Sequence, residues 1–121
     1  LPYLEQVKYK LSVIKLNITD LSIFVDKSWD LVMCIDVIEH LEKDQAEKAI
    51  LEMERIARKR VVLYTPVGMH IQEDGHGWGA GNPLYQKHRC GFSKEEMIAK
   101  GYSSQNSREV PPGQLCVKDL V

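Results

Sequence analysis

The sequence predicts an α/β domain built on a parallel sheet, and three observations support this prediction. Apolar runs of strand length alternate with segments of helical periodicity over most of the chain. The run from Leu31 to Ile35 is continuously apolar, which is typical of a central parallel strand covered on both faces. The 121 residues are enough for one domain with a core and too few for two.

Residues 1–36 supply a helix and two strands. Residues 1–11 predict a helix, because Pro2 suits a first helical turn and apolar residues recur at helical spacing. Residues 12–16 (SVIKL) predict a short strand, and residues 17–20 (NITD) predict a turn. Residues 28–36 then form the central strand of the predicted sheet.

The clearest helix spans residues 44–58, where apolar residues lie three and four positions apart. Asp44 and Glu47 resemble a capping box at its start. The basic segment RIARKR at 55–60 closes this helix, where cations favour the negative end of the helix dipole. Residues 60–65 predict the next strand.

The second half begins with a long loop at residues 66–91, which contains six of the eight glycines and three of the four histidines. Loops of this length inside a compact domain are usually functional or disordered. A second helix follows, with Ser93 as N-cap, Glu96 at the third helical position and Gly101 near its end. Residues 114–121 predict a final strand.

Composition argues against several classes of function. Sixteen basic and seventeen acidic residues give a net charge of -1, which provides no electrostatic footprint for nucleic acid. No apolar run approaches the ~18 residues that cross a membrane, and residues 1–10 lack a secretory signal pattern, so we expect a cytoplasmic protein.

The three cysteines form no C-x-x-C pair, which argues against a disulfide framework or a cysteine zinc site. Cys34 is predicted to be a small core residue.

Polar side chains follow the central strand at its carboxyl end, where parallel sheets bind their ligands. Asp36, Glu39 and His40 are therefore candidate site residues. If the chain turns helical after Asp36, all three project from one helix face. A mixed carboxylate and imidazole set suits Mg²⁺ or Mn²⁺. In the alternative interpretation, Glu39 and His40 merely start a helix and line a pocket.

Several segments, in a consistent order, resemble class I S-adenosylmethionine-dependent methyltransferases. DKSWDLV at 26–32 is similar to the segment leading into a family strand, and DVIEHL at 36–41 is similar to the segment leaving it. LEMERIARKRVVLYTPVG and GNPLYQKHRCGFSKEEMIAKGY follow in the family order, so the resemblance covers roughly residues 1–102. It implies a partial doubly wound, Rossmann-like sheet with flanking helices, S-adenosylmethionine as cofactor and a small-molecule acceptor methylated on oxygen.

The family's glycine-rich turn, E/D-x-G-x-G-x-G, does not occur in these residues. We therefore expect residues 1–121 to form a single, N-terminally truncated methyltransferase-like domain. The segment GHGWGA at 75–80 formally fits G-x-G-x-x-[GA]. That motif has meaning only where it joins a strand directly to a helix, so we interpret the segment as a flexible loop.

On the cofactor side, the resemblance implies that Asn17 and the backbone of Ile18 contact the adenine, and that Ile35 lines the cofactor. The sequence alone leaves two alternatives open. In these alternatives Asn17 and Asp20 simply form a turn, and Ile35 is an ordinary core residue.

On the acceptor side, Asp36, Glu39 and His40 resemble the E-x-x-E-H metal motif of ubiquinone-biosynthesis O-methyltransferases and of small-RNA 3′-end 2′-O-methyltransferases. Asp replaces the first Glu of that motif. His88 matches the further metal-binding His of the RNA-modifying relatives. A divalent ion at these four residues would orient two substrate oxygens and lower the pKa of a hydroxyl. Tyr64, at a strand end, is a further candidate for the pocket floor.

Two other functions remain open from the sequence. A metal-dependent 2′-O-methyltransferase of RNA 3′ ends is one, and the balanced charge disfavours it. The other is a non-catalytic binding or assembly module, whose unpaired sheet edge another chain or a second copy completes. The missing glycine-rich turn favours this second alternative.

Overall fold

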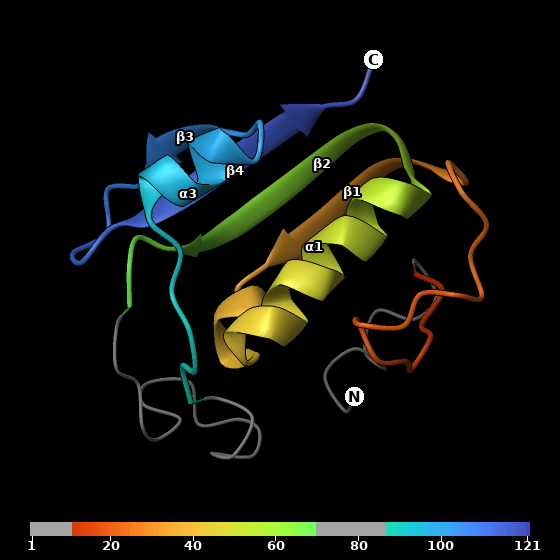
Figure 1. The fold of residues 1–121 in the computed structure, drawn as a ribbon, viewed down its shortest axis with the longest axis horizontal. Coiled ribbons are helices and arrows are strands. Elements are labelled where there is room, and N and C mark those ends of the chain that lie inside the picture. The colour runs from red at the N-terminus through yellow and green to blue at the C-terminus, as the bar shows by residue number, and fades with distance from the viewer. Residues whose placement is uncertain (1–10, 70–86) are drawn as a thin grey trace.

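The computed structural model describes residues 11–69 and 87–121. A four-stranded sheet and its helices form the described part of the chain (Figure 1). In chain order the elements are β1 (Trp29–Ile35), the short 3₁₀-helix η2 (Ile38–His40), α1 (Lys43–Ile56), β2 (Ala57–Pro66), α3 (Lys94–Ala99), β3 (Ser103–Asn106) and β4 (Gly113–Asp119).

The strands lie in the order β1-β2-β4-β3. β1 and β2 are parallel, with Met33 beside Val62 and Ile35 beside Tyr64. β4 runs antiparallel to both β2 and β3, so the sheet is mixed rather than purely parallel. Among the described strands β1 has a neighbour on one side only, which leaves its other edge open.

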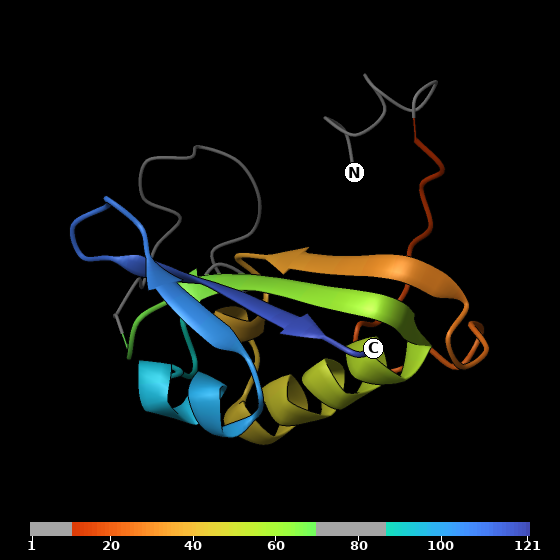
Figure 2. The same cartoon turned by 90° about the horizontal axis from the view of Figure 1, so that it is seen from above.

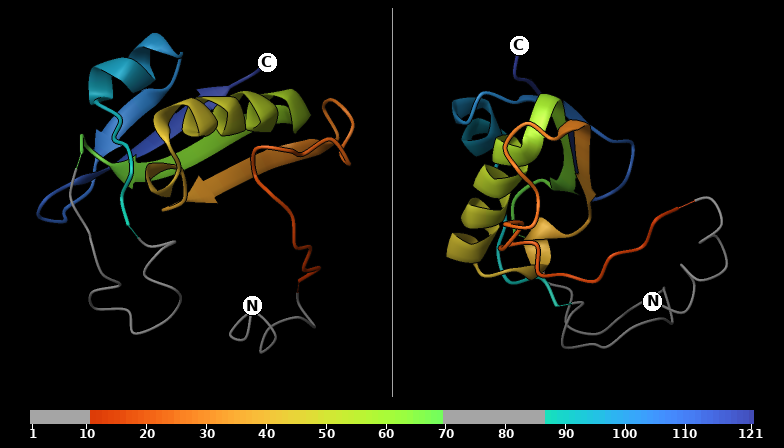
Figure 3. Two further views of the ribbon diagram at one scale, coloured as in Figure 1. Left: turned by 60° about the horizontal axis from the view of Figure 1, so that its bottom comes forward. Right: turned by 90° about the vertical axis from the view of Figure 1, so that its right-hand side faces the viewer.

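α1 and α3 lie on the same face of the sheet (Figures 2 and 3). The hydrophobic core fills the space beneath them and includes Ile50 and Met53 of α1, Cys34 of β1, and Val61 and Leu63 of β2. Cys34 is 4% exposed, which confirms its prediction as a core residue.

The other face of β1 is not covered by described residues. Leu31, Met33 and Ile35 are 49%, 59% and 45% exposed, whereas Cys34 points to the helices. Successive side chains of a strand point to opposite faces, so an apolar run becomes half buried where only one face is covered. The expectation that the central strand is covered on both faces is therefore wrong for the described part of the chain.

α1 begins at Lys43 and its N-cap, Glu42, makes no capping hydrogen bond through its side chain. The predicted capping box at Asp44 is therefore wrong. The helix ends at Ile56 and Ala57 starts β2 directly, so residues 57–60 belong to the strand and not to the helix end.

Arg55, in the last turn of α1, ties the preceding loop to the helix. Its guanidinium donates to the backbone oxygens of Leu21 and Phe24 at 3.0 and 2.9 Å, and to the Asp26 carboxylate at 2.9 Å. This cation binds particular loop oxygens as well as lying near the negative end of the helix dipole.

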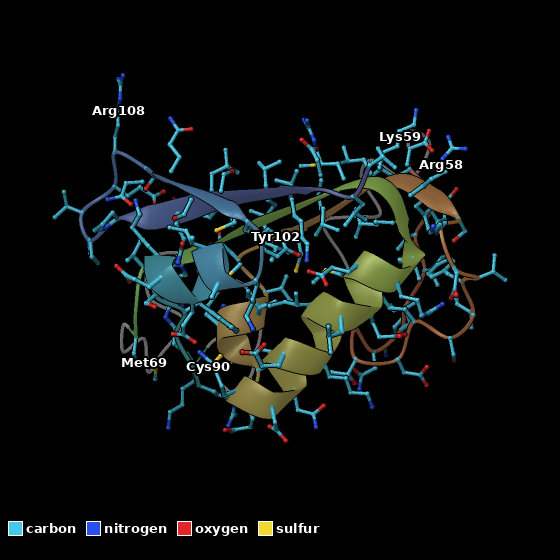
Figure 4. All side chains as sticks on the ribbon, turned by 45° about the horizontal axis from the view of Figure 1, so that its top comes forward. Arg58, Lys59, Met69, Cys90, Tyr102 and Arg108 are labelled. Carbon is cyan, nitrogen blue, oxygen red and sulfur yellow. The ribbon has the colours of Figure 1, made fainter. Side chains whose placement is uncertain are left out.

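α3 shows the predicted capping box. Ser93 Oγ accepts from the backbone N–H of Glu96, and the Glu96 carboxylate accepts from the backbone N–H of Ser93, both at 3.0 Å. Gly101 has a φ of +94° after the helix, a conformation that glycine adopts readily. Tyr102 follows and lies between the sheet and α1, where its hydroxyl donates to Glu54 at 2.7 Å (Figure 4).

The remaining predictions concern the other segments of the chain. Residues 12–16 are not a strand, because no described residue pairs with them and their apolar side chains are exposed. The predicted final strand is confirmed as β4, whereas β3 was not predicted. The predicted helix at 1–11 falls almost entirely outside the described residues, and so do the middle of the 66–91 loop and GHGWGA. Among the helices that the structure describes, none is long and apolar enough to cross a membrane.

Candidate active site

The carboxyl ends of β1 and β2 meet at one edge of the sheet, and Asp36 occupies the turn there. Its backbone N–H donates to the backbone oxygen of Tyr64 at 2.9 Å. Its φ of +56° lies in the left-handed region, which costs a non-glycine residue about 1–2 kcal/mol. Asp36 is thus outside η2, which begins at Ile38, and the predicted common helix face with Glu39 and His40 does not form.

Glu39 is directed into the protein and is 1% exposed. One carboxylate oxygen accepts from the Thr65 hydroxyl at 3.3 Å, and the other has no hydrogen-bond partner among the described residues. Burial raises the pKa of this carboxyl to about 7, against a backbone hydrogen bond that lowers it, and the Asp36 charge adds to the rise. Glu39 therefore holds a proton at pH values where ordinary glutamates have lost theirs.

The last residues of the long loop are hydrogen-bonded to η2 and α1. The backbone N–H groups of Arg89 and Cys90 donate to the Glu39 backbone oxygen at 2.7 and 3.3 Å. Lys43 of α1 donates to the Gly91 backbone oxygen at 2.5 Å. Cys90 lies at the same end of the molecule as Met69, the last described residue in the first part of the loop (Figure 4).

This fastening brings His88 against His40, as the sequence predicted. The two ring centroids are 4.8 Å apart with the planes at 71°. His40 Nδ1 lies 3.3 Å from the Lys87 backbone oxygen. Both imidazoles act on Asp36: burial and then the Glu109 charge raise the pKa of its carboxyl, and the two histidines oppose that rise.

The four predicted metal ligands, Asp36, Glu39, His40 and His88, do not converge as expected. Among residues 11–69 and 87–121 no three His, Cys, Asp or Glu side chains are placed to hold a metal ion. The four side chains do not converge because the Glu39 carboxylate is buried toward Thr65. Within the described part of the chain, these four side chains therefore do not form a site for a divalent ion.

The predicted cofactor residues differ in how accessible they are. The Asn17 side-chain oxygen accepts from the backbone N–H and the hydroxyl of Thr19 at 2.9 and 2.8 Å, so it is engaged in the predicted turn. Ile18 is partly buried against the core. Ile35 remains exposed on the uncovered face, directly before Asp36. Its apolar surface suits one side of a nucleoside-like ligand.

Glu109, which the sequence did not indicate, also lies at this edge. The Tyr64 hydroxyl donates to its carboxylate at 2.8 Å. The β3–β4 loop reaches this edge because β4 is antiparallel to β2 and pairs Gly113 with Pro66. No sequence motif marks Glu109. A prediction would have needed the direction of β4.

The order β1-β2-β4-β3, with helices against one face and polar residues at the carboxyl ends of the parallel pair, is a partial Rossmann-like arrangement. The model of the family described as "Methyltransferase domain" matches residues 3–65, which is more than half of the chain. The chain belongs to this family.

Solved structures agree with the fold. The chain is similar to the PH0226 protein of Pyrococcus horikoshii OT3, with 17% identity, a TM-score of 0.65, and coverage of 98% of this chain and 63% of that one. It is also similar to magnesium protoporphyrin IX methyltransferase from Synechocystis PCC 6803 with bound SAH, with 13% identity, a TM-score of 0.57, and coverage of 96% and 57%. The chain thus spans less than two thirds of either protein. A search of curated proteins found no match.

Proposed function

We propose that this protein is an S-adenosylmethionine-dependent methyltransferase that acts on the oxygen of a small molecule. The observation that carries the proposal is the family match over residues 3–65, which includes β1 and the turn at Asp36. The similar Synechocystis methyltransferase was solved with SAH, the demethylated cofactor. The free thiols of Cys34, Cys90 and Cys116 suit a reducing compartment, and we place the protein in the cytoplasm.

Some residues at the carboxyl ends of β1 and β2 are assigned to the cofactor and others to the methyl acceptor. Ile35 forms an apolar wall for the cofactor, with the turn at Asn17 and Ile18 at the adenine end. Asp36 and His40 face the acceptor, and the His40 imidazole is the candidate base for the acceptor proton. When bound, S-adenosylmethionine supplies an electrophilic methyl group, and this chain contributes positioning of the acceptor and exclusion of water.

Calorimetric titration of the chain with S-adenosylhomocysteine tests the proposal. We expect saturable binding, and we expect Ile35→Glu to abolish or strongly weaken it by placing a charge on the cofactor wall. Leu51→Glu is the matched control, because Leu51 is an exposed apolar residue of α1 away from the edge. Absence of binding at millimolar ligand, or equal binding by both variants, contradicts the proposal.

One observation favours a second function, a non-catalytic assembly module. No described strand pairs with the outer edge of β1, and Leu31 and Met33 on that strand are exposed; natural sheets usually protect such features. In this alternative a second copy pairs along β1. Sedimentation of the wild type and of Met33→Lys separates the two functions: a dimer that the substitution dissociates, together with no cofactor binding, supports the module.

A further inference from the structure

Lys43 contacts the end of the long loop and the start of α3, and none of the roles above uses these contacts. We propose that Lys43 is a positioning residue for the candidate base His40. It holds residues 87–91 so that the Lys87 carbonyl oxygen fixes the His40 ring with its proton on Nδ1. Nε2 is then the nitrogen that meets the acceptor. This inference rests on the proposed function, in which His40 takes up the acceptor proton.

The Lys43 ammonium joins parts of the chain that are far apart in sequence. It donates to the Gly91 backbone oxygen and pairs with the Glu96 carboxylate at 2.6 Å. It also lies over the Phe92 ring, 3.8 Å from the ring centroid, where a cation is attracted to the aromatic face. Glu96 is fixed in turn by the capping box of α3. One side chain of α1 therefore ties the end of the long loop to the start of α3.

The place of Lys43 in its own helix gives no reason for a cation. Lys43 is the first residue of α1, where the positive end of the helix dipole disfavours a positive charge. Its ion pair with Glu96 is also a weak reason, because the two side chains are 41% and 42% exposed and exposed pairs contribute little to stability. The contacts with Gly91 and Phe92 indicate instead that Lys43 serves the segment that it holds.

Other contacts hold the same segment from the side opposite Lys43. Phe92 is fully buried, and its backbone oxygen accepts from the Gly68 N–H and from the Gln114 side chain, both at 2.8 Å. A Cβ added to Gly91 would lie 2.5 Å from the Gly68 carbonyl carbon, so the two backbones are in direct contact. The end of the long loop is therefore held on both sides, and Lys43 supplies the contact that a substitution can remove.

The held segment sets the orientation of the His40 ring. Nδ1 lies 3.3 Å from the Lys87 backbone oxygen, and a carbonyl oxygen can only accept, so this hydrogen bond requires the proton on Nδ1. The edge-to-face contact with His88 restricts rotation of the ring. No other hydrogen bond joins the His40 ring to residues 11–69 and 87–121. Nε2 therefore keeps its lone pair and can take the proton that an acceptor hydroxyl loses on methylation.

Ring nitrogen chemical shifts in the isotope-labelled chain test the inference, because they distinguish the two neutral tautomers of a histidine. The spectra are recorded without cofactor, at the alkaline end of the ring titration. The signals of His40 are those missing from His40→Gln. We expect mainly the Nδ1–H tautomer of His40 in the wild type, although free histidine favours Nε2–H. A wild-type protein in which His40 is mainly Nε2–H overturns the inference.

Lys43→Met keeps the apolar stem of the side chain and removes its charge and donors. We expect the ratio of Nδ1–H to Nε2–H at His40 to fall about fivefold, the equivalent of one intramolecular hydrogen bond. Lys48→Met is the matched control, because Lys48 is an exposed lysine of the same helix, and it should leave the ratio unchanged. An unchanged ratio in Lys43→Met, or an equal fall in both variants, overturns the inference.

Glu96→Gln is a second test that leaves Lys43 in place. Its amide oxygen can still accept from the Ser93 N–H, but it no longer carries the charge that pairs with Lys43. We expect the ratio to fall about twofold, the effect of an exposed ion pair. Circular dichroism shows whether each variant is folded at the temperature of the spectra. If Lys43→Met is not folded, Glu96→Gln decides, and an unchanged ratio there overturns the inference.

The cofactor titration is read independently of the tautomer. Binding of S-adenosylhomocysteine by a chain whose His40 is mainly Nε2–H refutes the inference and leaves the proposed function standing. The expected tautomer and its dependence on Lys43, without cofactor binding, support the positioning of the ring and refute the proposed function for this chain. If neither result is obtained, both are refuted.

Discussion

We predict that the buried carboxyl of Glu39 makes the free energy of unfolding depend strongly on pH. In the native protein its pKa is about 7, whereas its ordinary value is 4.5. Between these values the native state binds a proton that the unfolded state has released. The free energy of unfolding therefore falls as the pH rises from about 4.5 through 7.

The size of this effect follows from the two values. One pKa unit corresponds to about 1.4 kcal/mol, so a rise from 4.5 to about 7 amounts to about 3 kcal/mol. This is a large part of the 5–15 kcal/mol that stabilises a typical domain. The carboxyls of Glu52 and Glu96 have lowered pKa values and lose their stabilising effect in acid, below this window.

Glu39→Gln isolates the contribution, because the amide keeps the shape of the side chain and stays neutral. We expect the variant to match the wild type within about 1 kcal/mol at pH 5, the value of one hydrogen bond, and to exceed it by up to about 3 kcal/mol at pH 8. Urea unfolding followed by circular dichroism at the two pH values measures both differences. Glu95→Gln, on the surface of α3, is the control and should follow the wild type. Parallel pH dependence in the wild type and Glu39→Gln would refute the reasoning.

Three other substitutions test local features of the fold by thermal unfolding. Ser93→Ala removes half of the capping box and should destabilise the protein by about 1 kcal/mol, while an unchanged melting temperature would mean that the cap is dispensable. Gly91→Ala would place a Cβ 2.5 Å from the Gly68 carbonyl carbon, and backbone displacement should cost about 1–3 kcal/mol. An unchanged melting temperature of Gly91→Ala would show that the segments at Gly68 and Gly91 move apart at little cost. Lys27→Gly relieves a φ of +56° and should stabilise the protein by up to about 1 kcal/mol, and a lower melting temperature would contradict this.

The sequence predicted the elements whose apolar pattern faces the described core. α1, β1 and β2 combine a strong pattern with burial on the helix side, and the capping residues marked the start of α3. Residues 12–16 have the composition of a strand, but ladder hydrogen bonds need a neighbour, and the described sheet supplies none. β3 escaped prediction because SSQN is polar and its pairing with β4 comes from backbone groups that any sequence provides.

The site was predictable in location but not in geometry. The rule that ligands bind beyond the carboxyl ends of parallel strands made Asp36 and His40 candidates, and the family resemblance added His88 as a candidate. The metal expectation assumed helical geometry immediately after the strand. Asp36 has a left-handed backbone conformation, so the chain is not helical at this residue, and the following turn buries Glu39. The spacing of residues in the sequence predicts neither feature. Glu109 required a long-range antiparallel pairing, which short-range patterns do not reveal.

β4 runs antiparallel to β2. The residues proposed for cofactor binding and those of the β3–β4 loop therefore come from different parts of the sheet. The parallel pair must keep its geometry if the cofactor is to bind, so substitutions there carry a double cost. The β3–β4 hairpin instead delivers residues 107–112 to the same edge from the outside of the sheet. If the protein has the proposed function, changes in the length or sequence of that hairpin loop would therefore alter which acceptors bind while the cofactor half stays intact.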